Sequence, residues 1–187
     1  MKLRVLVPIF AVALSVPAFA ECTDDVCGSI QKILAARSGN FSTIKGKPGR
    51  DPRGDPIWEG TQPIATLTNT CFIYKRGEGS QILSHYEYHC EAPGAAATSM
   101  LPSEKAKEIA ERLKVAAQTA DPKIVWFDDP AARALADIEG YHGTEGWYGG
   151  YAKNNIVLKV ETVVSAAVGS STSVTVFAKP LVRRDLK

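Results

Sequence analysis

Two segments of the chain place apolar residues at the spacing of one face of an α-helix. The first begins at a cap formed by Thr23 or Asp24 and runs to about residue 36. The second begins at the N-cap Ser103, ends at Asp121-Pro122, and carries Ala106, Ile109, Ala110, Leu113, Ala116 and Ala117 at helical spacing. These patterns predict an N-terminal helix and a longer, central amphipathic helix.

Other segments are rich in β-branched and aromatic residues, some with a period of two, which is typical of half-buried strands. They cover residues 41–45, 64–76, 81–90, 123–127, 155–166 and 172–179. Within residues 155–166, one predicted face carries Ile156, Leu158, Val160 and Val164, and the other carries Lys159 and Glu161. The last two segments are close enough in sequence to form a hairpin.

Glycine and proline mark the predicted connections. We predict an exposed loop over residues 46–56, a linker over residues 92–97, a glycine-aromatic loop over residues 139–151, and a short helix from Asp129 to Gly140. Short connections between strands favour antiparallel pairing. The predicted fold class is α+β: a mostly antiparallel β-sheet with the N-terminal helix and the central amphipathic helix packed on one face, stapled by disulfides.

The first twenty residues predict export. Lys2 and Arg4 precede an uncharged apolar run, and Ala18-Phe19-Ala20 has the small-x-small pattern of a cleavage site. We expect residues 1–20 to be a cleaved signal peptide and residues 21–187 to be one domain, located in the periplasm or secreted. No membrane span is expected after cleavage, because no later apolar run reaches about twenty residues.

The charge of the domain follows from that cleavage. Of the 22 basic residues, Lys2 and Arg4 leave with the signal, so 20 remain beside 20 acidic residues. A neutral chain lacks the basic surface of nucleic-acid-binding proteins, so no nucleic-acid partner is expected.

Four cysteines in an exported chain predict two disulfides, and four cysteines allow three pairings. We favour Cys71–Cys90 and Cys22–Cys27; the main alternative joins the N-terminal cysteines to the sheet. A tight turn after Arg76 would leave the first pair about 13 Å apart. A longer loop over residues 76–85, or a bulge, would bring the two cysteines together.

The segment His85-Tyr86-Glu87-Tyr88-His89 is a candidate for chemistry. In a strand, His85, Glu87 and His89 point to one face and the tyrosines to the other. The histidines would lie about 13 Å apart, so only Glu87 with one histidine could share a metal ion. The alternative, which we favour, is a solvated polar face with the tyrosines in the core. No metal or other cofactor is expected.

The glycine-aromatic loop is the candidate binding surface. Flat amphipathic rings on a flexible backbone give contact area at a low cost in side-chain entropy. The candidate residues are Tyr141, His142, Trp147, Tyr148 and Tyr151. The alternative is that the glycines form turns while the rings cover the sheet or the core.

Three short motifs match known signatures without their usual context. Arg53-Gly54-Asp55 is the adhesion tripeptide, but such residues are also expected in a proline-rich turn. Ser42-Thr43-Ile44-Lys45 fits the S-x-x-K motif of penicillin-binding enzymes without its S-D-N and K-T-G companions. Asp128-Asp129 could be a carboxylate pair, but Asp129 is better explained as the N-cap of the short helix that begins at Pro130. The sequence contains no G-x-S-x-G motif, and nothing in it indicates a serine–histidine–aspartate triad.

These observations favour a non-catalytic function. We expect an exported soluble binding, accessory or inhibitor-like module of the cell envelope whose partner is an envelope protein, a peptide or a glycan. The alternative is a small exported hydrolase or metal-binding protein that uses His142 or the face of His85, Glu87 and His89.

Overall fold

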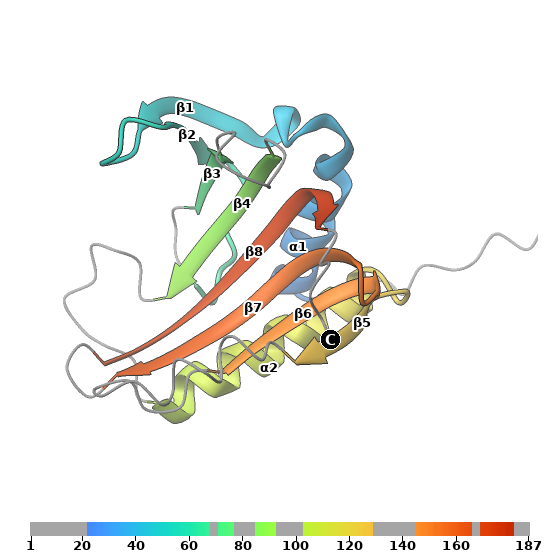
Figure 1. Ribbon diagram of the computed structural model, residues 1–187. Helices are drawn as coiled ribbons and strands as arrows, with labels where there is room; N and C mark the ends of the chain where they lie inside the picture. Colours follow the sequence, from blue (N-terminus) through green and yellow to red (C-terminus); the bar gives the residue numbers. More distant parts are fainter. Residues whose placement is uncertain are drawn as a thin grey trace, which may run out of the picture.

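A computed structural model describes residues 22–67, 71–76, 85–92, 103–128, 145–165 and 169–181. It contains the helices α1 (Asp25–Ala36) and α2 (Ser103–Ala120) (Figure 1). The strands are β1 (Lys45–Arg50), β2 (Pro56–Gly60), β3 (Cys71–Arg76), β4 (His85–Ala92), β5 (Val125–Asp128), β6 (Glu145–Ala152), β7 (Asn155–Ser165) and β8 (Gly169–Leu181). The predicted fold class is confirmed.

The eight strands form one antiparallel sheet in the order β1-β2-β3-β4-β8-β7-β6-β5. Strands β4 and β8 are the two central strands and are far apart in sequence: Glu87 pairs with Phe177, and Ala92 pairs with Thr172. The pair joins an N-terminal half-sheet (β1–β4) to a C-terminal half-sheet (β5–β8) (Figure 1).

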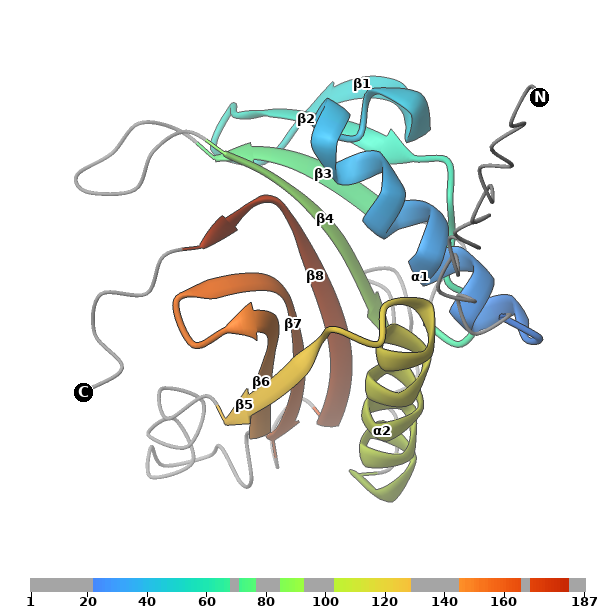
Figure 2. The ribbon, with the colours of Figure 1, turned by 90° about the vertical axis from the view of Figure 1, so that its right-hand side faces the viewer.

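Both described helices cover the same face of the sheet (Figure 2). They pack against each other, and α2 also packs against β7 and β8. The core between helices and sheet includes Ile30, Leu113, Tyr88, Leu158 and Val174, all nearly inaccessible to solvent. Burial of this apolar surface is the main driving force that holds the layers together.

Local sequence explains where the helices begin and end. The Asp24 side chain accepts a hydrogen bond of 2.7 Å from the Cys27 backbone N–H and so caps α1. The six apolar residues predicted for the inner face of α2 are all buried. On its outer face, Glu108 forms an ion pair with Lys105. A turn at Asp121 follows the helix, as the sequence predicts.

The two disulfides are Cys22–Cys27 and Cys71–Cys90, as predicted. Strands β3 and β4 pair Arg76 with His85, which is the longer-loop register. That register puts Cys71 beside Cys90, with 4.5 Å between their Cα atoms. The sheet therefore sets the distance that the Cys71–Cys90 bond requires.

Several predictions of local structure are wrong. Residues 64–67, expected at the start of a strand, form a bridge and a turn. Residues 45–50, placed mostly in a loop, form strand β1, and residues 42–44, expected in a strand, form a 3₁₀ turn. The charged residues Lys47 and Arg50 lie on β1, which is an edge strand and therefore tolerates exposed polar residues. In β7, an irregularity between Ile156 and Leu158 interrupts the predicted alternation, so that Val157 joins the core cluster while Ile156 is also buried.

Several predictions lie outside the described residues: the signal peptide over residues 1–20, the linker after Ala92, and the short helix between Asp129 and Gly140. In the part of the chain that the structure describes, neither helix has the length and apolarity needed to cross a membrane.

Candidate functional site

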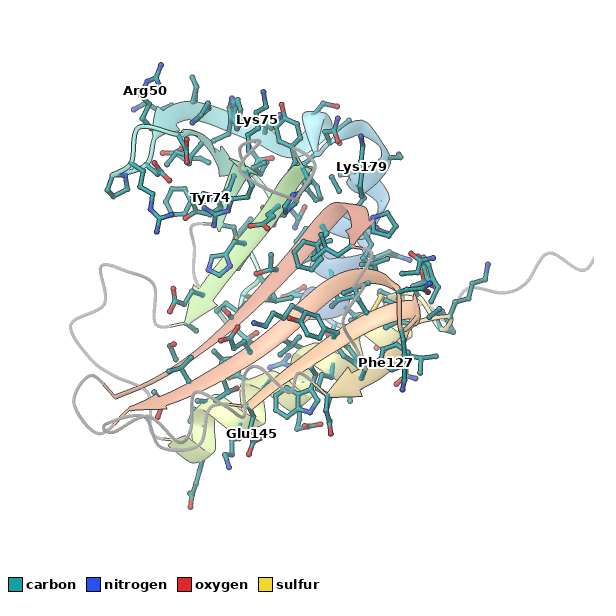
Figure 3. All side chains as sticks on the ribbon, in the orientation of Figure 1. Arg50, Tyr74, Lys75, Phe127, Glu145 and Lys179 are labelled. Carbon is teal, nitrogen blue, oxygen red and sulfur yellow. A yellow bond between two sulfur atoms is a disulfide. The ribbon has the colours of Figure 1, made fainter. Side chains whose placement is uncertain are left out.

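The face of the sheet opposite α1 and α2 concentrates the polar and aromatic groups. We call it the helix-free face; Figure 3 shows it with Tyr74 near one end and Phe127 near the other. In the central strands it is formed by the residues that alternate with the core positions: Phe72, Tyr74, Arg76, His85, Glu87, His89, Lys159, Thr175 and Phe177. The prediction that His85, Glu87 and His89 share a face is therefore confirmed.

The Glu87 carboxylate links its two neighbours on this face. Its Oε1 lies 2.7 Å from His85 Nε2, and its Oε2 accepts a hydrogen bond of 2.9 Å from Arg76 Nε. The His85 side chain is only 8% exposed and the Glu87 side chain 16%. The expected solvated face is thus wrong for His85, because the β3–β4 register sets Arg76 opposite His85 and the two neighbouring strands enclose the network.

The His89 ring is held separately from this network. Its Nδ1 lies 2.9 Å from Thr175 Oγ1 on β8, and its Nε2 lies 3.9 Å from Glu91 Oε2. Both ring nitrogens thus face partners other than Glu87. Among the described residues, no three His, Cys, Asp or Glu side chains come close enough together to hold a metal ion.

The contact between His89 and Glu91 predicts a dependence of stability on pH. The neighbouring His89 side chain is the main cause that lowers the pKa of Glu91 below its ordinary value of 4.5. The unfolded chain then binds a proton near pH 4.5 while the folded chain does not, so this stabilisation is complete above that range and is lost as the pH falls below it. We expect Glu91→Gln to lose less stability than wild type when urea unfolding is repeated at falling pH.

A suitable control for that measurement is Glu108→Gln, which changes an exposed glutamate on α2. The control should follow the wild-type profile. If Glu91→Gln also follows it, the His89 contact does not stabilise the charged carboxylate.

A second group of residues lies at the β3 end of the helix-free face. We call Phe72, Tyr74, Arg76 and His89 the aromatic patch. The Phe72 and Tyr74 ring centroids are 6.3 Å apart, the Arg76 guanidinium lies 4.5 Å from the Tyr74 ring centroid, and the His89 ring meets Tyr74 edge-on at 6.2 Å. Burial raises the pKa of Tyr74 above its ordinary value of 10.0.

Sequence reasoning missed three members of the aromatic patch. The signal was present in residues 71–76, where Cys71 and Ile73 alternate with Phe72, Tyr74 and Arg76. The alternation predicts that these three share a face, but only the register with β4 brings them to His89 and Glu87.

The predicted glycine-aromatic loop is wrong over its second half, because residues 145–152 form strand β6 between β5 and β7. The glycines are required by close packing. A Cβ on Gly149 would lie 3.0 Å from Leu158 and Trp126 side-chain atoms, and a Cβ on Gly150 would lie 2.4 Å from the Asn155 carbonyl oxygen. Glycine in a strand marks close approach here, rather than a flexible segment.

The candidate rings of this segment do not form one surface. Trp147 faces the helices, where Lys114 Nζ lies 4.4 Å from its ring centroid. Tyr148 faces the other way, with Lys159 Nζ 5.7 Å from its ring. Tyr151 donates a hydrogen bond of 2.7 Å to Asp121. Tyr141 and His142 lie outside the described residues.

A shallow groove of about 580 Å³ lies between the ends of α1 and α2, lined in part by Leu34, Ala120, Asp121 and Tyr151. Its main polar groups already bond one another: Asp121 accepts from the Tyr151 hydroxyl and from the Lys123 backbone N–H. Burial, followed by the bond to Asp121, raises the pKa of Tyr151. Because Asp121 and the Tyr151 hydroxyl already form these hydrogen bonds, they offer little to a polar ligand in this groove.

Comparison with known proteins gives no relative: no family model, no curated protein and no solved structure matches the chain. The proposals below rest on the residues alone.

Proposed function

We propose that the protein is an exported, non-catalytic binding protein that recognises a partner protein of the cell envelope through the aromatic patch. Two observations support export. The first twenty residues have the pattern of a signal peptide. Both disulfides join buried or half-buried cysteines, as in proteins that fold in an oxidising compartment.

The composition of the aromatic patch carries the proposal. Tyrosine and arginine are enriched among the residues that contribute most to protein–protein binding. Phe72, Tyr74 and His89 are half-buried, so their rings are held in place by the sheet while one side stays accessible. A rigid ring loses little side-chain entropy when a partner covers it.

The geometry favours a protein over a sugar. The Phe72 and Tyr74 ring planes are inclined by 54°, so they do not form a flat platform for a sugar ring. The Arg76 guanidinium, stacked over Tyr74, adds a charge that can pair with a carboxylate of the partner.

The chemistry of Glu87 supports binding over hydrolysis. A general base needs an oxygen that is able to accept the substrate's proton. Glu87 Oε1 already faces His85, and Oε2 accepts from Arg76. These two contacts tie both carboxylate oxygens to side chains of the same sheet.

A comparison of the wild-type protein with a double variant of the aromatic patch tests the proposal. The oxidised wild-type protein and Tyr74→Ala/Arg76→Ala are used to capture proteins from an envelope extract, and the captured protein is purified for direct binding. We expect the double variant to bind at least about tenfold more weakly, because losing central aromatic and arginine contacts typically costs more than 1.4 kcal/mol.

Val115→Ser is the matched control, since Val115 is 64% exposed on α2, a helix that covers the other face. The control should bind as wild type does. Equal binding by the Tyr74→Ala/Arg76→Ala variant, or no captured protein at all, would count against the aromatic patch as the binding surface.

A further inference from the structure

The turn between β1 and β2 presents Arg53, Gly54 and Asp55 at the tip of an exposed hairpin. Figure 3 shows Arg50 at the outer end of β1, where this turn begins. The Gly54 backbone N–H donates to the Asp51 carbonyl at 2.9 Å, and the Asp51 N–H donates to the Asp55 carbonyl at 3.0 Å. Gly54 has φ of +87°, a conformation that favours glycine.

The side chain of Asp51 completes the turn. Its Oδ1 accepts hydrogen bonds from the backbone N–H groups of Arg53 and Asp55, both at 2.9 Å. The Arg50 guanidinium donates to the Gly54 carbonyl at 2.6 Å. The requirements of the turn therefore explain why aspartate occurs at position 51 and glycine at position 54, as we expect from the sequence.

Turn formation does not explain the side chains of Arg53 and Asp55. Among the described residues, neither the Arg53 guanidinium nor the Asp55 carboxylate takes part in a hydrogen bond or ion pair. Arg53 is exposed and Asp55 half-exposed. The turn thus holds a cation and an anion on either side of a glycine and uses neither of them.

We propose that this hairpin tip is a second interaction site, which binds a protein receptor that holds a divalent cation beside an acidic group. Carboxylate oxygen is the ligand that such hard cations prefer, so Asp55 would complete the coordination of the receptor's ion. The Arg53 guanidinium would pair with the acidic group. Gly54, which has no side chain, lets the receptor approach the backbone closely.

The rigidity of the turn supports the proposal. Hydrogen bonds from the Asp51 side chain and Arg50 fix the backbone on both sides of Gly54 before any partner arrives. A preorganised loop loses less entropy on binding than a flexible peptide does. The site shares no residue with the aromatic patch, and the variants that test the two proposals are different, so either proposal can fail without the other.

The test measures binding of the oxidised mature protein to the purified ectodomain of an adhesion receptor that recognises Arg-Gly-Asp peptides through a divalent cation. We expect binding in Mg²⁺ that is abolished by EDTA and is competed by a cyclic Arg-Gly-Asp peptide. Arg53→Gln and Asp55→Glu should each raise the Kd at least about tenfold; the second keeps the charge and moves the carboxylate.

The control is Lys47→Gln/Glu59→Gln, which removes one positive and one negative exposed charge from the same hairpin. The control should bind as wild type does. The proposal is overturned if the wild-type protein does not bind, if binding survives EDTA or either tip variant, or if the control loses binding to the same extent. Unchanged melting temperatures of the variants show that the fold is kept.

Discussion

Replacing Cys71 and Cys90 together by alanine is expected to lower the free energy of unfolding by about 3 kcal/mol. The bond joins two neighbouring strands across a sequence separation of 19 residues. In the chain-entropy view, losing it lets the unfolded chain regain the freedom of that loop. Both sulfurs are buried in the core, so the variant also loses packing.

Urea unfolding of the oxidised proteins measures this effect. The matched control is Cys22→Ala/Cys27→Ala, whose bond spans a separation of 5 residues. The same relation gives about 2 kcal/mol for the shorter loop, so the control should be the more stable of the two variants. The reverse order would show that neither loop length nor packing at Cys71 and Cys90 governs the loss.

Gly60→Ala is the second substitution with a large expected effect, a loss of at least about 2–3 kcal/mol. A Cβ at this position would lie 2.3 Å from the Tyr88 hydroxyl oxygen and 2.5 Å from the ring carbon that bears it. Tyr88 cannot easily move away, since its ring is buried and its hydroxyl donates to the Gln62 carbonyl and accepts from the Gln62 N–H. Burial also raises the pKa of Tyr88 to about 12.

A double-mutant cycle isolates this clash. Tyr88→Leu removes the hydroxyl and the end of the ring, so Gly60→Ala should cost much less in the Tyr88→Leu background than in wild type. Gly49→Ala is the control, because a Cβ there would approach Ile57 only to 3.5 Å. An equally large loss in both backgrounds would place the cost in the backbone of β2 rather than in contact with Tyr88.

The elements that could be predicted from the sequence are those specified locally. Helix α1 follows from the Asp24 cap, and α2 follows from the spacing of its alanines, Ile109 and Leu113. The β7–β8 hairpin follows from alternation and a short connection. In each case the determining residues lie within a few positions of one another, where propensity and periodicity act.

The strands β1 and β6 could not be predicted because their glycines indicate loops when only the sequence is known. Gly46, Gly149 and Gly150 are instead fixed by close contacts with Glu59, Leu158 and Asn155, which lie on other strands. The candidate site on the helix-free face likewise has one part that local sequence predicts and one part that it does not. Alternation predicts the shared face of β4, but the register between β3 and β4 determines that Arg76 meets Glu87.

The central position of β8 has a consequence for how the chain folds. This strand, residues 169–181, pairs with β4 on one side and with β7 on the other. While β8 is still being synthesised, β4 and β7 are unpaired edges, and the two half-sheets have no strand to join them. Contacts across such long sequence separations also form slowly. A nascent chain therefore stays without its complete sheet, and with two open strand edges, until β8 emerges.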